Sequence, residues 1–343
     1  MQRPSRHRHG KLLCLLFFCL ASVTFPFALA QTAVPFAIDS EATLVFAGDL
    51  MQHSPQYKRA RQADGSYDYS VCFEEVAPLI AGADLAVGNL EVTLGGEPYS
   101  GYPCFSAPDD WLYALRDTGF DLLITSNNHC LDRGRSGVLR TLDVADSAGV
   151  CTLGTYRNDA DRAARYPLLV EVNGIRFVFL AATYGTNGFS VPAPCRVNAL
   201  SHLPKEDYTY LDELEADIAA AHALHPDVLI AIMHWGYEYK LQPSRVQREL
   251  ADWLLDHGVD HIIGGHPHVI QPTELVYDDY YADPHLVAYS QGNFISNMSA
   301  PDTDTGTLLT LRFRKVGFVT RLVDIREDIV RCTRPDYRLV IED

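Results

Sequence analysis

Two histidines in the segment Gly264-Gly265-His266-Pro267-His268 are the first residues that suggest chemistry. They stand two positions apart after a short apolar run, so both imidazoles can reach one cavity from a turn. The glycines let the backbone approach a ligand closely because they carry no side chain. Histidine pairs are also common on protein surfaces, so this pair indicates a metal site only if other ligands join it.

Further ligand types follow other apolar runs of the chain. His234 ends the run 228–233, and Asp49 follows Gly48 at the end of the run 42–47. Three more candidates stand after similar runs: Glu91, Asn128 and His129. Carboxylates, amide oxygens and imidazoles suit divalent ions such as Zn, Mn, Fe or Mg. We expect one or two such ions, because a pair about 3.5–4 Å apart clamps a phosphoryl group and activates a bridging water. Glu91 is the candidate bridge, and the alternative for any one ligand is a buried, hydrogen-bonded side chain.

Alternating strands and helices must position these residues. The apolar runs predict strands at 42–47, 85–87, 122–125, 228–233, 261–263 and 286–289. Helical spacing predicts helices at 109–118, 137–147, 208–224 and 247–257. Asn173-Gly174 between two apolar runs predicts a hairpin, and alternation in 308–313 and 318–325 predicts a closing one. Ligands gather at the carboxyl ends of parallel strands, which is where the candidate residues stand.

The composition excludes some functions. The formal net charge is −16. Residues 1–30 hold four of the 28 basic and none of the 44 acidic residues, which leaves a formal charge of −20 for the rest. A nucleic-acid partner is therefore not expected, because phosphate backbones require a basic footprint.

The first 30 residues are typical of a secretory signal peptide. Four basic residues precede the apolar run 12–20, and Ala28-Leu29-Ala30 is a small-x-small cleavage site. The alternative is an uncleaved membrane anchor, since 12–30 is nearly long enough to span a bilayer. We therefore expect a secreted or extracytoplasmic protein, or a membrane-anchored one if the leader is not cleaved.

The cysteine count adds an expectation of disulfides. Six cysteines follow the leader, and an even number in an exported protein predicts up to three disulfides. The expected pairs are Cys72 with Cys104, Cys130 with Cys151, and Cys195 with Cys332, and the alternative is free buried thiols.

Six motifs, in order between residues 42 and 297, resemble the poly-gamma-glutamate capsule biosynthesis (CapA) family of the calcineurin-like metallophosphatase superfamily. They are Gly48-Asp49-Leu50-Met51, Asn89-Leu90-Glu91, Asn127-Asn128-His129 with Asp132-x-Gly134, His234-Trp235-Gly236 with Glu238, Gly265-His266-Pro267-His268 and Gly292-Asn293-Phe294. The resemblance implies an α/β fold, a sandwich of two mixed β-sheets flanked by helices. It implies a domain over 42–297, and we expect 298–343 to add a C-terminal β-hairpin extension on the same domain.

The resemblance also implies roles for the residues. Asp49 and His268 would bind one metal, with Glu91 bridging to the other. The second metal would be held by Asn128, His234 and His266. His129 would be the catalytic acid, supported by Asp132, for which a turn-capping aspartate is the alternative. Glu238 is expected to bind substrate by shaping its pocket, with a surface carboxylate as the alternative. Asn293 is expected to bind substrate or to support a metal ligand, with a turn residue as the alternative.

Two positions depart from the superfamily pattern, and the first is Glu91, which stands where the second motif usually has an aspartate. Met51 stands where the usual Asp-x-His motif has its histidine, so one metal site could be weakened or lost unless Glu238 or His53 compensates.

These residues and the resemblance leave three candidate functions. The first is a role in making an anionic envelope polymer, beside membrane-bound synthesis subunits. The second is a secreted metal-dependent phosphoesterase acting on a phosphoester substrate. The third is a non-catalytic assembly subunit that keeps a residual metal site.

Overall fold

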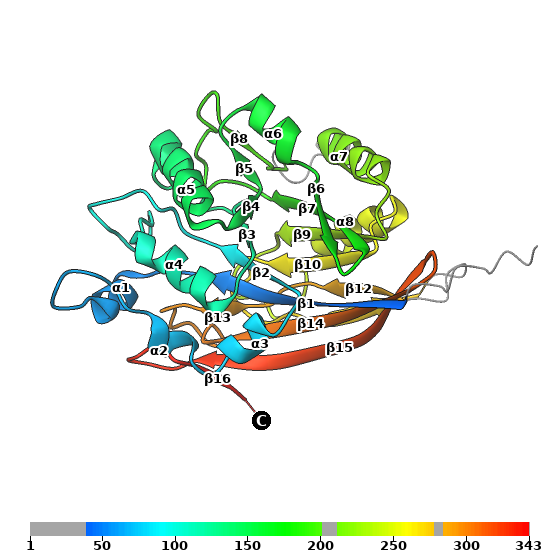
Figure 1. Cartoon of the computed structure of the whole chain (residues 1–343). Helices are drawn as coiled ribbons and strands as arrows, with labels where there is room; N and C mark the ends of the chain where they lie inside the picture. Colours follow the sequence, from blue (N-terminus) through cyan, green and yellow to red (C-terminus); the bar gives the residue numbers. More distant parts are fainter. Residues whose placement is uncertain (1–38, 201–210, 278–283, 343) are drawn as a thin grey trace, which may run out of the picture. The chain divides into compact units, whose positions relative to one another are not determined.

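Two mixed β-sheets form the frame of the computed structural model, which describes residues 39–200, 211–277 and 284–342 (Figure 1). The predicted signal peptide lies outside these residues. The first sheet runs, in order, β16 (Leu339–Ile341), β15 (Val319–Cys332), β14 (Thr305–Val316), β1 (Asp39–Leu50), β2 (Leu85–Leu90), β3 (Leu122–Ile124) and β4 (Cys151–Leu153), with β13 (Asn293–Ile295) also paired to β1.

The second sheet runs, in order, β11 (Thr273–Val276), β12 (His285–Ala288), β10 (His261–Gly265), β9 (Val228–His234), β7 (Ile175–Thr183) and β6 (Leu168–Val172). A small ribbon joins β5 (Thr155–Tyr156) to β8 (Arg196–Val197). In the first sheet, β1 to β4 pair in parallel, and β14, β15 and β16 are added antiparallel on the other side of β1. In the second sheet, the inner strands β12, β10, β9 and β7 are parallel, and the edge strands β11 and β6 are antiparallel. The predicted sandwich of two mixed sheets is therefore confirmed.

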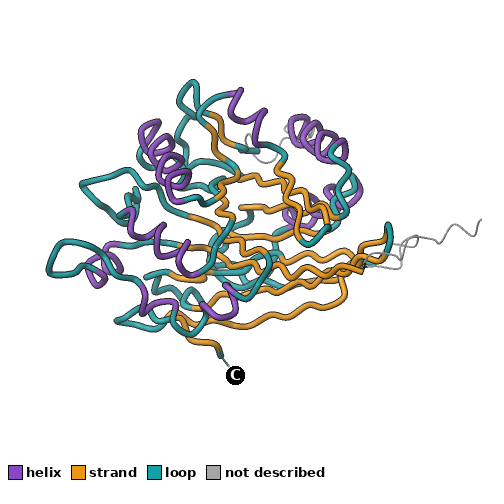
Figure 2. The backbone as a smooth tube through the Cα atoms, in the orientation of Figure 1, coloured by secondary structure: helices purple, strands orange, loops and turns teal. Residues whose placement is uncertain are grey.

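Helices cover the strands on the outside (Figure 2). They are α1 (Ser54–Ala60), α2 (Ser70–Phe73), α3 (Ala77–Ala81), α4 (Asp109–Thr118), α5 (Gly134–Ala148), α6 (Asp159–Arg165), α7 (Asp212–Ala223) and α8 (Arg245–Asp256). The helix predicted at 109–118 is confirmed at both ends, and its last turn stops at Gly119, whose φ of 114° favours glycine. The first three residues of the helix predicted at 208–224 lie outside the described residues. No helix in the described ranges has the length and apolar character needed to cross a membrane.

Strand alternation sorts the side chains of β1 into two cores. Leu44 and Phe46 join the cluster that packs between the two sheets, whereas Val45 and Ala47 join the cluster on the other face, beneath α4. This division follows from the two-residue period of a strand. Both faces of β1 are therefore buried, and only its end is left to carry polar side chains.

The two predicted hairpins are confirmed. Asn173 and Gly174 both have positive φ, 51° and 80°, in the turn between β6 and β7. The closing hairpin is β14 and β15, and β14 pairs with β1 from Asp39↔Val316 to Ala47↔Leu308. The C-terminal segment thus supplies the antiparallel neighbour of β1, and β2 pairs with its other side.

The predicted disulfide pairs are wrong, because all six cysteines of the described residues are free. The reason is where the thiols lie. Cys195 packs with Cys130 in a small third cluster, whereas Cys332 packs with Cys72 in the second. Cys72 Sγ instead donates to the Asp336 carbonyl at 3.7 Å. Cys130 is likewise separated from Cys151, which packs against the first cluster, so the members of these two predicted pairs lie in different clusters.

Candidate metal centre

The predicted ligands converge where strands of the two sheets end. Asp49 is the next-to-last residue of β1, Glu91 follows β2, and His234 ends β9. His266 and His268 follow β10 with positive φ, 96° and 59°. The sheets approach closely here, because a Cβ on Gly265 would lie 2.8 Å from Asp49 Oδ1. Asn128 is the sixth predicted ligand, and all six residues are at most 3% exposed.

Two groups of these residues could each hold a metal ion. Asp49, Glu91 and His234 place one ligand atom each within 4.8 Å of one another, and Glu91, His266 and His268 do the same. Glu91 belongs to both groups, which is the placement that a bridging carboxylate requires. The two groups divide the histidines differently from the ligand sets that the resemblance implies, because His234 falls with Asp49 and His268 falls with His266. Each implied set still contains one short contact: His268 Nδ1 lies 3.2 Å from Asp49 Oδ2, and His234 Nε2 lies 2.8 Å from Asn128 Oδ1.

Unsatisfied polar atoms show that the cluster fits a cation. Within the described part of the chain, neither carboxylate oxygen of Glu91 has a hydrogen-bond partner, and neither does Nδ1 of His266. Burying such atoms without partners is costly, and native proteins pair nearly all of them. A divalent ion would satisfy both residues at once. The donor set of carboxylate, amide and imidazole is one that Zn, Mn, Fe and Mg share.

The pKa directions describe the same environment. Burial raises the pKa of Glu91 well above its usual value, and the nearby negative charge of Asp49 adds to the shift. Burial alone would also raise the pKa of Asp49, but the hydrogen bond and charge of His268 bring it below its usual value. Burial lowers the pKa of His234 to about 3 and that of His266 well below its usual range. Both imidazoles are therefore neutral at pH 7, the form that binds metals.

His129 lies beside this cluster with a carboxylate behind it. Its Nδ1 lies 2.8 Å from Asp132 Oδ2, and both side chains are buried. The backbone N–H of Phe105 donates to the same oxygen of Asp132 at 2.7 Å, and the Phe105 ring packs edge-on against the imidazole at 4.7 Å. Asp132 therefore orients an imidazole, rather than only capping the turn before Gly134. This is the arrangement that a supported general acid requires.

Sequence reasoning missed two asparagines at the site. Asn89 Nδ2 donates to Asp49 Oδ1 at 2.7 Å and lies 3.2 Å from His234 Nδ1. The Oδ1 of Asn187 accepts from Asn128 at 3.3 Å, while its Nδ2 lies 3.5 Å from His129 Nδ1. Asn89 stands inside the motif Asn89-Leu90-Glu91, and its place there could have marked it as a site residue. Asn187 lies in a loop, with φ of 50°, and no pattern marks it.

The two residues predicted to bind substrate lie in different surroundings. Asn293 is fully buried, its Oδ1 lies 3.0 Å from His268 Nδ1, and its Nδ2 donates to the Thr303 carbonyl at 2.9 Å. These contacts place it behind a metal ligand. Glu238 is exposed and, with Tyr184 and His266, lines a cavity of about 480 Å³. The structure therefore brings Glu238 to the space beside the metal ligands.

Met51 does not join the cluster. It is 2% exposed, packs in the second core and accepts a hydrogen bond from Ser296 Oγ at 3.7 Å. His53 is the imidazole that lies close by. Burial lowers its pKa to about 4, and the charges of His268 and His129 act in the same direction. Its Nδ1 lies 3.2 Å from Gln56 Oε1, and it belongs to neither ligand group.

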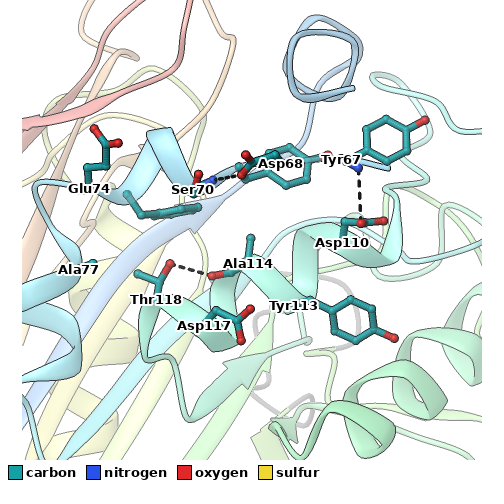
Figure 3. A pocket seen from close by; sticks show the side chains of 12 residues that line it. Tyr67, Asp68, Ser70, Glu74, Ala77, Asp110, Tyr113, Ala114, Asp117 and Thr118 are labelled. Carbon is teal, nitrogen blue, oxygen red and sulfur yellow. Dashed lines mark hydrogen bonds between the residues drawn. The ribbon is translucent and has the colours of Figure 1, made fainter. Parts of the chain in front are cut away.

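A second cavity, of about 400 Å³, lies between α2, α3 and α4 (Figure 3). None of the predicted site residues lines it. Three of its polar side chains have partners in the protein: Asp110 accepts from Tyr67 N, Asp68 accepts from Ser70 N, and Thr118 Oγ1 donates to the Ala114 carbonyl. The buried hydroxyl of Tyr69 has no hydrogen-bond partner among the described residues. The predicted catalytic and metal-binding residues therefore lie at the strand ends and not around this cavity.

Solved structures similar to this chain include two phosphatase-type proteins. A phosphatase from Mycoplasma pneumoniae aligns over 87% of this chain and 96% of its own, with a TM-score of 0.46 and 14% identity. The calcineurin-like phosphoesterase YfkN from Bacillus subtilis aligns over 85% and 90%, with a TM-score of 0.44 and 14% identity.

Two sequence relatives share a higher identity with this chain than these two solved structures do. The capsule biosynthesis protein CapA of Bacillus anthracis is 26% identical over 84% of this chain and 67% of its own. The PGA biosynthesis protein CapA of Bacillus subtilis is 26% identical over 84% of this chain and 73% of its own. The family described as bacterial capsule synthesis protein PGA_cap matches residues 43–298, which include every ligand of the cluster. The chain belongs to this family.

Proposed function

We propose that this chain is an exported, metal-dependent hydrolase of phosphoester type that serves the synthesis of a capsule polymer at the cell envelope. One observation carries the hydrolase part: Glu91 belongs to both ligand groups and has two buried carboxylate oxygens without partners. The names of the relatives support the capsule part, and the sequence of residues 1–30 supports export.

In this proposal, the residues of the site have distinct roles. Asp49, Glu91, Asn128, His234, His266 and His268 would hold one or two divalent ions. Such ions supply charge that stabilises the phosphoryl group and lowers the pKa of bound water. Asn89 orients Asp49 and His234 from behind. His129 would donate a proton from its Nε2 to the leaving oxygen, because Asp132 holds Nδ1.

The test is reconstitution with metal followed by phosphoester assays. The mature chain, stripped by a chelator, is loaded with Mn, Zn, Fe or Mg and assayed on p-nitrophenyl phosphate and its bis ester. We expect turnover with at least one metal, and its loss in His234→Ala. His222→Ala is the matched control, because His222 is an exposed imidazole on α7 whose Nε2 lies 3.2 Å from the His257 carbonyl and which belongs to neither ligand group. No turnover with any metal or ester contradicts the proposal.

The burial of Met51 in the second core favours a second candidate, a non-catalytic assembly subunit that acts beside membrane-bound synthesis subunits. That candidate predicts bound metal without turnover, together with capsule production restored by His234→Ala in a strain lacking the gene. The hydrolase predicts that the same variant fails to restore the capsule.

A further inference from the structure

A cavity opens directly beside the metal ligands. It has a volume of about 480 Å³, and His266 forms part of its wall. We call it the Tyr184–Glu238 cavity. Tyr184 connects it to the cluster, because its ring centroid lies 4.5 Å from that of His266 and it stacks on His234 at 6.4 Å. A substrate held at the metals would therefore extend one of its groups into this space.

The walls of the cavity are aromatic and aliphatic. Tyr184, Trp235 and Tyr237 supply three ring systems, and Val246 and Leu250 of α8 add aliphatic surface. A space of this size and composition suits an apolar group of several heavy atoms.

Most polar groups of the lining are already paired within the protein. Trp235 Nε1 donates to the Tyr289 carbonyl at 2.8 Å. The Oε1 of Gln247 accepts from Ser244 N at 2.9 Å, and its Nε2 donates to Gln271 Oε1 at 2.8 Å. Neither lysine nor arginine occurs among the described residues that line the cavity. Glu238 is the carboxylate among the described lining residues, and it forms a side-chain hydrogen bond with Tyr239. Because Glu238 is exposed and a carboxylate can accept several hydrogen bonds, it can still meet a ligand in the cavity.

These features indicate which ligand charge the cavity favours. An anionic group would lie near Glu238 without a basic side chain to compensate it, in a protein whose net charge is already −16. An ammonium group would instead have a carboxylate partner and aromatic faces, and both attract cations. We infer that the Tyr184–Glu238 cavity binds an apolar group that carries an ammonium nitrogen, as the non-reacting part of the substrate. As a substrate site, this inference rests on the function proposed above.

Direct binding to the metal-free protein tests the cavity without any turnover. Phenethylammonium, 2-phenylethanol and 3-phenylpropanoate share an aromatic body and differ in charge, and their binding can be followed by ligand-observed NMR. We expect the ammonium compound to bind most tightly and the carboxylate most weakly. Glu238→Gln should reduce the preference for ammonium over alcohol by about two- to fivefold, the range of an exposed ion pair. Tyr184→Ala should weaken binding of both.

The control is Glu249→Gln, which removes one carboxylate from α8 at a residue outside the cavity lining that pairs with Arg245. It should leave the ammonium preference unchanged. Equal or tighter binding of the carboxylate, no binding of any of the three compounds, or an unchanged preference in Glu238→Gln would overturn the inference.

Turnover separates this inference from the proposed function. With metal restored, phosphocholine should be hydrolysed faster than glycerol phosphate, and Glu238→Gln should reduce the difference. Ammonium-selective binding without turnover of any ester would refute the proposed hydrolase and leave the cavity as a cation-binding site. Equal turnover of both esters, without selective binding, would refute the cavity inference and leave the hydrolase standing.

Discussion

Asp132 Oδ2 lies 2.8 Å from His129 Nδ1 and also accepts the backbone N–H of Phe105 at 2.7 Å. The carboxylate is thus fixed by the backbone before it orients the imidazole. We expect His129→Ala to lower kcat by about 10²- to 10⁴-fold, the usual contribution of a general acid. Asp132→Asn should lower kcat by roughly 10- to 100-fold, since an amide still accepts from Phe105 but supports the imidazole less well. Both variants should retain their metal content by elemental analysis, and loss of metal in either would contradict the assignment.

Removing the charge of Glu91 should abolish metal binding without harming the metal-free fold. A metal at a hundred times its Kd stabilises the folded state by about 2.7 kcal/mol, which raises Tm by roughly 5 °C. We expect this rise to vanish in Glu91→Gln and to persist in Glu249→Gln. Because the Glu91 carboxylate is buried without partners, the metal-free Glu91→Gln protein should unfold at the same or a higher temperature. A metal-induced rise that survives in Glu91→Gln would show that this carboxylate is not a ligand.

Asn89 should control metal affinity although it is not expected to be a ligand. Its Nδ2 donates to Asp49 Oδ1 and its Oδ1 accepts from Asn127 Nδ2 at 3.1 Å, so it links two motifs of the site. Truncating such a supporting group typically weakens metal binding by about 10- to 100-fold. We therefore expect Asn89→Ala to raise the metal Kd by this factor in a chelator competition. Asn89→Asp should not restore the affinity, because a carboxylate cannot donate to Asp49.

The stability of the metal-free protein should fall as the pH drops below about 6.5. Burial lowers the pKa of His261 to about 3, and the Leu286 N–H donates to its Nδ1 at 3.1 Å. The unfolded chain binds this proton from pH 6.5 downward while the folded chain does not, so His261 alone removes about 2 kcal/mol of unfolding free energy between pH 7 and 5. His261→Asn keeps an acceptor for Leu286 but has no titrating ring. Its urea-unfolding free energy should fall less over this range, and an unchanged pH dependence would refute the assignment.

Much of the architecture could be predicted from the sequence because its strands are apolar on both faces and stop at polar residues. The strand predicted at 228–233 is found as Val228–His234, and the helix predicted at 247–257 is found as Arg245–Asp256. The six candidate metal ligands were marked by chemical type and by their place at strand ends. Periodicity underestimated β1, predicted at 42–47 and found at Asp39–Leu50, because its polar ends are held by pairing with β14 and β13.

Other features depend on contacts that no local pattern encodes. Asn187 reaches the site through a loop, and its partners Asn128 and His129 are 59 and 58 positions away. The cysteines were paired from their even number, but which thiols share a cluster is decided by the tertiary fold. The role of Asp132 had two alternatives in sequence, and the contact with His129 chose between them.

The pairing of β1 with β14 has a consequence for the order of events during synthesis of the chain. β1 carries Asp39, and β14 carries Arg314, its ion-pair partner 275 positions later. The strand that carries Asp49 therefore lacks its antiparallel neighbour until residues 305–316 have left the ribosome. Pairing over such a separation is slow to form. The nascent protein thus has its candidate metal ligands long before it has the frame that holds them, so we expect capture of a metal ion to follow the arrival of the last strands.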